Sequence, residues 1–247
     1  MSAGGFHLES FLAWARVDPA VFELRPDYRA LLLAVGGLVP GPSDQAGEAL
    51  LQKAESSVQQ FLRESPVDQL PHIAAWREAY RAFGAKPQRT RNSVESLMRR
   101  AESGLPRVNR LTDVYNAVSV LHQLPVGGED LSRYMGAPQL IRATGAEPFD
   151  TTADGAAVIE HPDPGEVVWS DDAGVTCRRW NWRQARRTQL RDDTTAALFI
   201  MDVLDPMTDA ELHAAVEDLS AHLRRLGPDV RIARRLLSAD AASEPAD

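Results

Sequence analysis

The chain has 247 residues, of which 44% are hydrophobic and 25% charged, with a formal net charge of -8, and this composition excludes a disordered or fibrous protein. The single cysteine, Cys177, excludes an internal disulfide and a cysteine-based zinc cluster, and it fits a reducing cytoplasm. Residues 1–9 lack the basic region and long apolar run that are typical of a signal peptide, and the apolar run 31–39 is too short to cross a bilayer, so we expect a cytoplasmic protein without a membrane partner.

Residues 1–65 are predicted to form an N-terminal extension that packs on the main domain. Two short apolar runs, residues 21–24 and 28–35, are predicted to be strands, and Gly36-Gly37 ends the second one. The loop at residues 40–44 places Asp44 as the N-cap of a helix.

Four helices are predicted next, from apolar residues spaced three and four apart. They cover residues 49–62, 69–83, 93–103 and 111–121. Trp76, Tyr80 and Phe83 share one face of the second helix and are predicted to lie in the core. Cys177, further along the chain, is expected to be a buried small apolar residue.

After Pro125 the pattern changes to short apolar runs between turns. Strands are predicted at residues 139–143, 156–160, 166–170, 175–182 and 196–204, followed by a helix at 209–226. This pattern predicts an α+β fold in which helices flank a bent mixed β-sheet or a partial barrel. The main domain covers residues 66–237, and residues 238–247 are predicted to be a disordered acidic tail.

Positive charge is concentrated in two segments of this acidic chain. Residues 76–116 hold nine Lys/Arg against four Asp/Glu, and residues 178–191 hold six arginines and no acid. Such segments indicate a localised anion site, although arginines on solvated helix faces or in structural ion pairs would give the same pattern.

Local catalytic motifs are absent. The sequence has no Gly-x-x-x-x-Gly-Lys loop, no Gly-x-Ser-x-Gly elbow and no His-Glu-x-x-His helix, and its six histidines lack ligand spacing. We therefore expect neither a metal nor another cofactor.

Several ordered motifs carry a longer-range resemblance. They include Trp76-Arg77-Glu78-Ala79-Tyr80, Asp113-Val114-Tyr115-Asn116, Gly128-Glu129-Asp130-Leu131, Gly145-Ala146-Glu147-Pro148 and Arg179-Trp180-Asn181-Trp182-Arg183. Together they resemble freestanding B3/B4-type domains, relatives of the editing domain in the beta subunit of bacterial phenylalanyl-tRNA synthetase. The resemblance covers residues 70–226. It implies hydrolysis of the ester that joins a wrong amino acid to the 3′ end of a tRNA, chemistry that needs only an oriented water and donors for the oxyanion.

The resemblance also implies candidate site residues. Asn116 corresponds to a pocket asparagine, Asp202 to a pocket glutamate and Glu147 to a widely seen family glutamate, and these are the candidate catalytic residues. Tyr115 replaces a threonine in the pocket wall, and Trp182 is the second candidate pocket residue. The synthetase histidine falls near Gly127, where this sequence has no histidine. Asn116 could equally cap or bridge buried backbone groups. Asp202 lies among apolar residues, so either an arginine neutralises it or it is held for function.

The second basic segment supplies the candidate tRNA contacts. Arg179 and Arg183 are expected to share one face of an extended strand with Asn181, and Trp180 and Trp182 are available to stack on a single-stranded RNA end. Arg186, Arg187 and Arg91 complete the set of candidate tRNA-binding residues.

These features favour a deacylase that acts in trans on mischarged tRNA, with a water oriented by Asn116 and Asp202. The alternative is a non-catalytic module that binds tRNA, an amino acid or a related metabolite, which the missing histidine favours. A third possibility is a protein-interaction domain whose arginines pair with an acidic partner. DNA is not expected as a partner.

Overall fold

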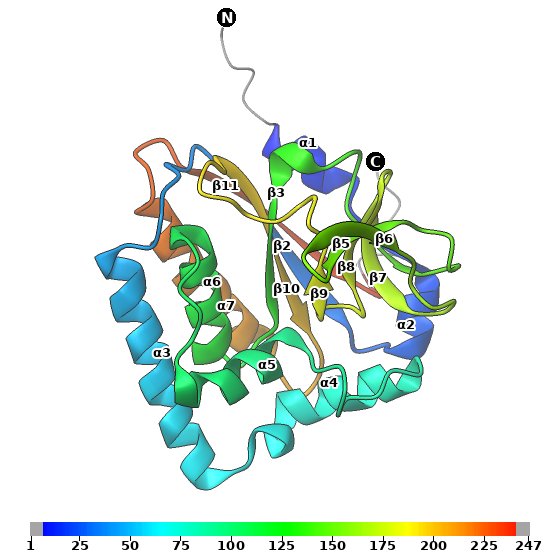
Figure 1. Cartoon of the computed structure of the whole chain (residues 1–247), viewed down its shortest axis with the longest axis horizontal. Coiled ribbons are helices and arrows are strands. Elements are labelled where there is room, and N and C mark those ends of the chain that lie inside the picture. Colours follow the sequence, from blue (N-terminus) through cyan, green and yellow to red (C-terminus); the bar gives the residue numbers. More distant parts are fainter. Residues whose placement is uncertain (1–6, 241–247) are drawn as a thin grey trace, which may run out of the picture.

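The computed structural model describes residues 7–240 and confirms the α+β class (Figure 1). The α-helices are α1 (Leu8–Ala13), α2 (Pro19–Leu24), α3 (Gln45–Glu64), α4 (Pro71–Ala82), α5 (Ser93–Arg100), α6 (Arg110–Leu121) and α7 (Asp209–Arg224). The strands are β1 (Arg16–Val17), β2 (Arg29–Gly36), β3 (Val126–Asp130), β4 (Gln139–Arg142), β5 (Phe149–Ala153), β6 (Ala156–Glu160), β7 (Val167–Asp171), β8 (Gly174–Arg178), β9 (Arg183–Gln184), β10 (Ala196–Val203) and β11 (Arg231–Ser238).

A four-stranded antiparallel sheet in the order β11-β2-β10-β3 forms the centre of the fold. Strand β2 pairs along its whole length with both β10 and β11, so it occupies an interior position. Its residues are almost all buried because both faces of the sheet are covered. Residues 1–65 therefore supply an interior strand of this sheet, and a boundary at residue 65 would separate that strand from its partners.

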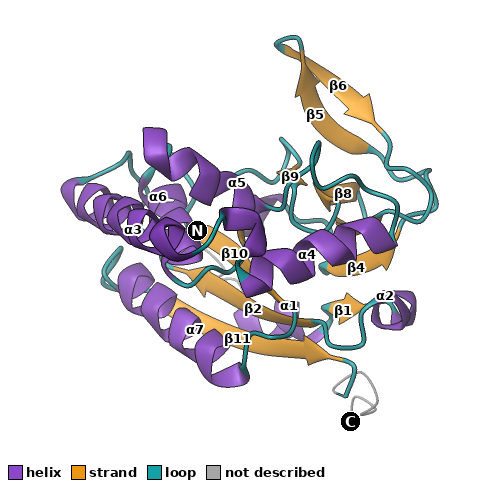
Figure 2. Cartoon of the chain, turned by 90° about the horizontal axis from the view of Figure 1, so that it is seen from below, coloured by secondary structure: helices purple, strands orange, loops and turns teal. Residues whose placement is uncertain are grey.

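The two faces of this sheet pack against different layers. Leu31, Leu33 and Val35 of β2 join the core that contains the apolar residues of α3, α6 and α7. The alternate residues Leu32 and Ala34 join a second core with the tryptophans of α4 and of the other sheet. Figures 1 and 2 show α3, α6 and α7 gathered on one side and the second sheet on the other.

The second sheet has five strands in the order β1-β4-β7-β8-β9, with β1 parallel to β4 and the other pairs antiparallel. Among residues 7–240, one isolated bridge, Glu129 to Gln189, links β3 to the segment after β9. A single bridge does not close a barrel, so the predicted α+β fold with a mixed sheet flanked by helices is confirmed and neither sheet closes on itself among the described residues. The hairpin β5–β6 projects from the body (Figure 2).

Two predicted strands are corrected. Residues 21–24 belong to helix α2, because the Asp18 side chain caps the backbone N–H of Ala20 and Pro19 occupies the first turn. The strand expected at 175–182 ends at Arg178, because Arg179 and Trp180 adopt left-handed backbone conformations with φ of 47° and 67°.

The remaining predicted elements are confirmed to within a few residues, including Asp44 as the N-cap of α3. Strands β1, β3, β5, β9 and β11 and helix α1 were not predicted. Ser238, the first residue of the predicted tail, ends β11, and residues 241–247 lie outside the described part of the chain. Within residues 7–240, no helix combines the length and apolar character needed to cross a membrane.

Candidate functional site

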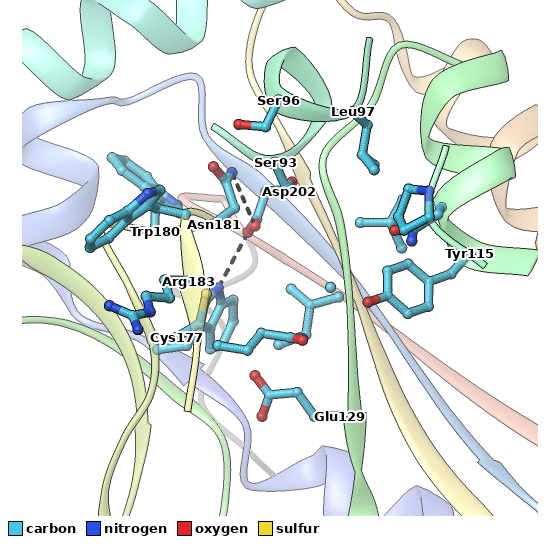
Figure 3. A pocket seen from close by; sticks show the side chains of 18 of the residues that line it. Ser93, Ser96, Leu97, Tyr115, Glu129, Cys177, Trp180, Asn181, Arg183 and Asp202 are labelled. Atoms are coloured by element: carbon cyan, nitrogen blue, oxygen red, sulfur yellow. Dashed lines mark hydrogen bonds between the residues drawn. The ribbon is translucent and has the colours of Figure 1, made fainter. Parts of the chain in front are cut away.

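A cavity of about 320 Å³ lies between the two sheets at the β3 edge (Figure 3). Strands β3 and β10 form its floor, β7 and β8 one wall, and α5, α6 and the segment before β9 the rest. Its lining includes Ser93, Ser96, Leu97, Arg100, Pro106, Tyr115, Asn116, Val126, Gly127, Glu129, Trp169, Cys177, Trp180, Asn181, Trp182, Arg183, Gln184, Ile200 and Asp202. A partly apolar cavity with a few converging polar groups is typical of a small-ligand site.

The strand register places two acids on the cavity floor. Gly127 pairs with Ile200 and Glu129 pairs with Leu198, while the Asp202 backbone N–H donates to Pro125. Alternate residues of a strand share a face, so Asp202 and Glu129 face the same side of the sheet. Leu198, the partner of Glu129, is four positions before Asp202 on β10. The two acids are therefore separated by about 14 Å between Cα atoms, at 3.4 Å per residue.

Asp202 is 2% exposed and has no arginine partner among the described residues. Its Oδ1 accepts hydrogen bonds from the Tyr28 hydroxyl (2.6 Å) and Trp169 Nε1 (3.3 Å), and its Oδ2 accepts one from Asn181 Nδ2 (3.3 Å). Burial raises the pKa of Asp202 to about 6, although these three donors act to lower it. A carboxylate has about four lone-pair sites, so one acceptor position remains for a water or a ligand.

Glu129 is fully buried and contributes the second acid. Its Oε2 accepts a hydrogen bond from the Tyr134 hydroxyl (2.5 Å), while no group within residues 7–240 completes a hydrogen bond to Oε1. Burial raises the pKa of Glu129 to about 7, against the lowering effect of the Tyr134, Thr176 and Thr188 hydroxyls. The sequence offered Glu129 only as part of a motif, because its position on the floor depends on the pairing of β3 with β10.

Tyr115 and Asn116, both on α6, line the cavity as expected for pocket residues. The Tyr115 ring packs on Phe199. Asn116 is buried, and no group in the described part of the chain bonds to its side-chain amide. The amide is therefore available to a molecule in the cavity rather than used as a cap.

Gly127, near which the synthetase histidine falls, also lines the cavity. A Cβ built there would have only Gln184 Nε2 as a near neighbour, at 3.5 Å. At the adjacent Gly128, a Cβ would lie 2.8 Å from Tyr115 Cε1 and 2.9 Å from Leu190 Cδ1. Gly127 therefore leaves open space in the pocket, whereas Gly128 allows Tyr115 to approach the strand.

Of the two tryptophans expected to stack on RNA, only Trp182 is accessible. Trp180 is 0% exposed and packs edge-on against Trp76 and Tyr28, so a base at the surface cannot reach it. Trp182 is partly exposed, lines the cavity and lies 4.7 Å from the Arg179 guanidinium. The prediction of a surface-stacking role for Trp180 is wrong because the left-handed turn directs its ring into the core.

The predicted row of Arg179, Asn181 and Arg183 on one strand face is also wrong, since the chain turns at residues 179 and 180. Asn181 is buried against Asp202, and Arg179 pairs with the buried Glu166 at 3.5 Å. Arg183 lines the cavity and donates to the Thr152 carbonyl at 2.9 Å.

Most other arginines of the two basic segments are in ion pairs, with acids that are either near in sequence or from other parts of the chain. Arg187 pairs with Asp171 at 2.7 Å, Arg186 with Asp150 at 3.1 Å, and Arg91 lies 3.8 Å from Glu95. At the mouth of the cavity, by contrast, the exposed Arg100 has no acidic partner among the described residues, and neither has Arg183. The exposed Lys86, Arg89 and Arg191 also lack an acidic partner among the described residues, so the mouth holds part of the free positive charge of these two segments.

Glu147 does not belong to the cavity. Its carboxylate accepts hydrogen bonds from the Thr144 N–H and hydroxyl and from the Gly145 N–H, at 2.8–3.0 Å. Gly145 has a φ of 96°, so this carboxylate stabilises a turn that requires glycine. The prediction of a catalytic role for Glu147 is therefore corrected to a structural one.

Comparison with known proteins identifies the family. The model of the B3/4 domain matches residues 75–232, so the chain belongs to the B3/4 domain family. One similar solved structure is an N-terminal fragment of the phenylalanyl-tRNA synthetase beta subunit from Pyrococcus horikoshii, with 10% sequence identity and a TM-score of 0.44. The match covers 90% of this chain and half of that fragment. No curated protein matches the chain.

Proposed function

We propose that this protein is an aminoacyl-tRNA deacylase that acts in trans and hydrolyses the ester of mischarged tRNA. The observation that carries the proposal is the charge distribution of the cavity. Asp202 and Glu129 lie inside, whereas the unpaired Arg100 and Arg183 lie at the mouth. An aminoacyl-tRNA end has a complementary distribution, with a cationic amino acid beyond an ester and phosphates behind it.

The chemistry proposed is water attack on the ester carbonyl. Asp202 retains one acceptor position and has a raised pKa, so at neutral pH it can hold a water and accept its proton. The proton then passes to the ribose oxygen as the acyl C–O bond of the ester breaks, which releases the free amino acid and the tRNA. The Asn116 amide is the candidate donor to the developing oxyanion. An aminoacyl ester is already activated, so positioning of water and stabilisation of charge suffice without a nucleophilic side chain.

The mouth of the cavity would bind the RNA end. Arg100 and Arg183 would contact phosphates, and the exposed part of Trp182 would stack on the terminal base. The ion-paired Arg186, Arg187 and Arg91 lie in the same two segments and would add to the positive field rather than make the closest contacts.

A deacylation screen tests the proposal. Purified protein is incubated with a panel of mischarged tRNAs, and the wild type is compared with Asp202→Ala, Asp202→Asn and the turn variant Glu147→Gln as a matched control. We expect hydrolysis by the wild type and the control and loss of hydrolysis in both Asp202 variants. Intact tRNA at high protein concentration, under conditions where a synthetase control clears it, contradicts the proposal, and equal rates for all variants remove Asp202 from the mechanism.

A second candidate function is a binding module without turnover. The glycine at position 127 favours it, because no histidine is present among the residues that line the cavity. It predicts that an aminoacyl-adenosine mimic protects the protein against thermal unfolding while mischarged tRNA stays intact.

A further inference from the structure

Three buried acids of this fold are neutralised by arginine, whereas the buried Asp113 and Asp130 are bonded by backbone N–H and hydroxyl donors. Glu166 receives two hydrogen bonds from Arg178 at 2.9 and 2.8 Å, Asp171 is paired with Arg187, and Glu95 is paired with Arg77 at 2.8 Å. The two cavity acids have no such partner. Asp202 receives three donors in place of an arginine, whereas Glu129 receives only the Tyr134 hydroxyl.

The surroundings of Glu129 contain further unused hydrogen-bonding capacity. The hydroxyls of Thr176 and Thr188 are fully buried and near enough to lower the pKa of Glu129, yet neither completes a hydrogen bond within residues 7–240. Three buried oxygens without partners in one place are unusual, since folded proteins pair nearly all buried polar groups. The cluster of Glu129 Oε1, Thr176 Oγ1 and Thr188 Oγ1 therefore has hydrogen-bonding capacity that the described residues leave unused.

Of the three residues in this cluster, Glu129 lines the cavity and the two threonines do not. Glu129 is completely buried, and Figure 3 shows it apart from Asp202 and Asn181. The proposed function holds the ester near Asp202. The separation of four residue positions between Asp202 and Glu129 is too long for the ligand's α-amine to reach Glu129, and it matches the reach of an extended side chain. The cations in the lining, Arg100 and Arg183, are both at the mouth.

We infer that Glu129 is a specificity-determining residue that binds a primary ammonium group at the end of the ligand's side chain, so the accepted amino acid is of the lysine type. An ammonium has three N–H donors and no acceptor, which complements a carboxylate flanked by two hydroxyl oxygens. Its positive charge also compensates a buried carboxylate that the fold leaves without a cation. This inference rests on the proposed function for the aminoacyl nature of the ligand and for its orientation.

The test uses 3′-deoxy-3′-aminoadenosine carrying its amino acid as a stable amide, so that binding is measured without turnover. The lysyl compound is compared with the norleucyl compound, which has the same carbon chain without the amine, and with the 6-hydroxynorleucyl compound. We expect calorimetry at pH 7.5 to show at least tenfold tighter binding of the lysyl compound than of either analogue. In Glu129→Gln this preference should fall to within threefold, while the control Glu147→Gln retains it.

Equal affinities for the lysyl and norleucyl compounds in the wild type overturn the inference without any variant. A preference that survives Glu129→Gln shows that another group selects the amine and also overturns it. Equal binding of the lysyl and 6-hydroxynorleucyl compounds would show that a neutral donor satisfies Glu129, and it would overturn the assignment of an ammonium group. A lysyl preference that depends on Glu129, found in a protein that leaves every mischarged tRNA intact, supports the inference and contradicts the proposed catalysis.

Discussion

The two ends of the cavity floor contain the same kind of group in different surroundings. At one end Asp202 is surrounded by Tyr28, Trp169 and Asn181, whose donors occupy most of its lone pairs. At the other end Glu129 has one hydroxyl donor and one oxygen without a partner. Burial raises the pKa of both carboxyl groups. The two carboxyl groups therefore differ more in their hydrogen bonds than in the direction of their pKa shifts. A carboxylate with most of its lone pairs bonded suits the positioning of water, and one with an unbonded oxygen suits recognition of a ligand.

The largest expected difference between the two ends is in the rate of deacylation. Asp202→Asn keeps the size of the side chain but removes the proton acceptor, so we expect the rate to fall at least about 100-fold. Glu129→Gln should leave the rate on a norleucyl-tRNA within a few-fold of wild type. Single-turnover hydrolysis measures both rates, and circular dichroism confirms that each variant is folded. Equal losses in the two variants would show that the acids act as one unit.

The pH dependence of stability should also distinguish them. A carboxyl group whose folded pKa is raised binds more protons when folded, so its contribution to stability decreases as pH rises from the unfolded to the folded value. This window ends near pH 6 for Asp202 and near pH 7 for Glu129. Relative to wild type, Glu129→Gln should gain about 3 kcal/mol between pH 4.5 and pH 8, from a shift of about 2.5 pKa units.

Urea unfolding at several pH values measures this gain, with Glu147→Gln as the control, because its difference from wild type should stay constant between pH 6 and pH 8. Between pH 6.5 and pH 8, the stability of Glu129→Gln relative to wild type should continue to rise, whereas that of Asp202→Asn should be nearly constant. A constant difference for Glu129→Gln across the whole range would show that Glu129 titrates normally.

A smaller effect on stability is expected at Gly127 and Gly128, the adjacent glycines of β3. Gly127→Ala should be neutral or stabilising by up to about 1 kcal/mol, because the added methyl has room and the unfolded chain loses freedom. Gly128→Ala should destabilise by roughly 1–3 kcal/mol, because its methyl would displace Tyr115. The free energy of unfolding in urea compares the two variants, and the opposite order would show that the wall at Tyr115 adapts easily.

The smallest effect is expected at the mouth. Arg100→Ala and Arg183→Ala should each weaken RNA binding a few-fold and reduce the slope of log affinity against log salt by about 1. Arg187→Ala is the matched control, since the Arg187 guanidinium already pairs with Asp171 and should contribute less to the slope. Fluorescence anisotropy with a single-stranded RNA ending in CCA at several salt concentrations measures the slopes. A larger effect from Arg187 would move the RNA contact away from the cavity mouth.

The amino-acid sequence by itself determined the α+β class, the long helices and the core aromatic residues Trp76 and Tyr80, because hydrophobic periodicity is a local property of the chain. It also indicated the family and the pocket residues Tyr115, Asn116 and Asp202 through ordered motifs. It did not predict strands β3 and β11, since the glycines of β3 and the arginines of β11 interrupt the alternation of apolar residues.

Only the tertiary structure decided which charges are free and which acids share the cavity. The acid-free segment 178–191 is largely neutralised by Glu166, Asp150 and Asp171, which come from other parts of the chain. The left-handed turn at Arg179 and Trp180 buries a tryptophan that an extended strand would have exposed. Glu129 reached the cavity floor through the register of β3 against β10, and register depends on long-range pairing that no local pattern specifies.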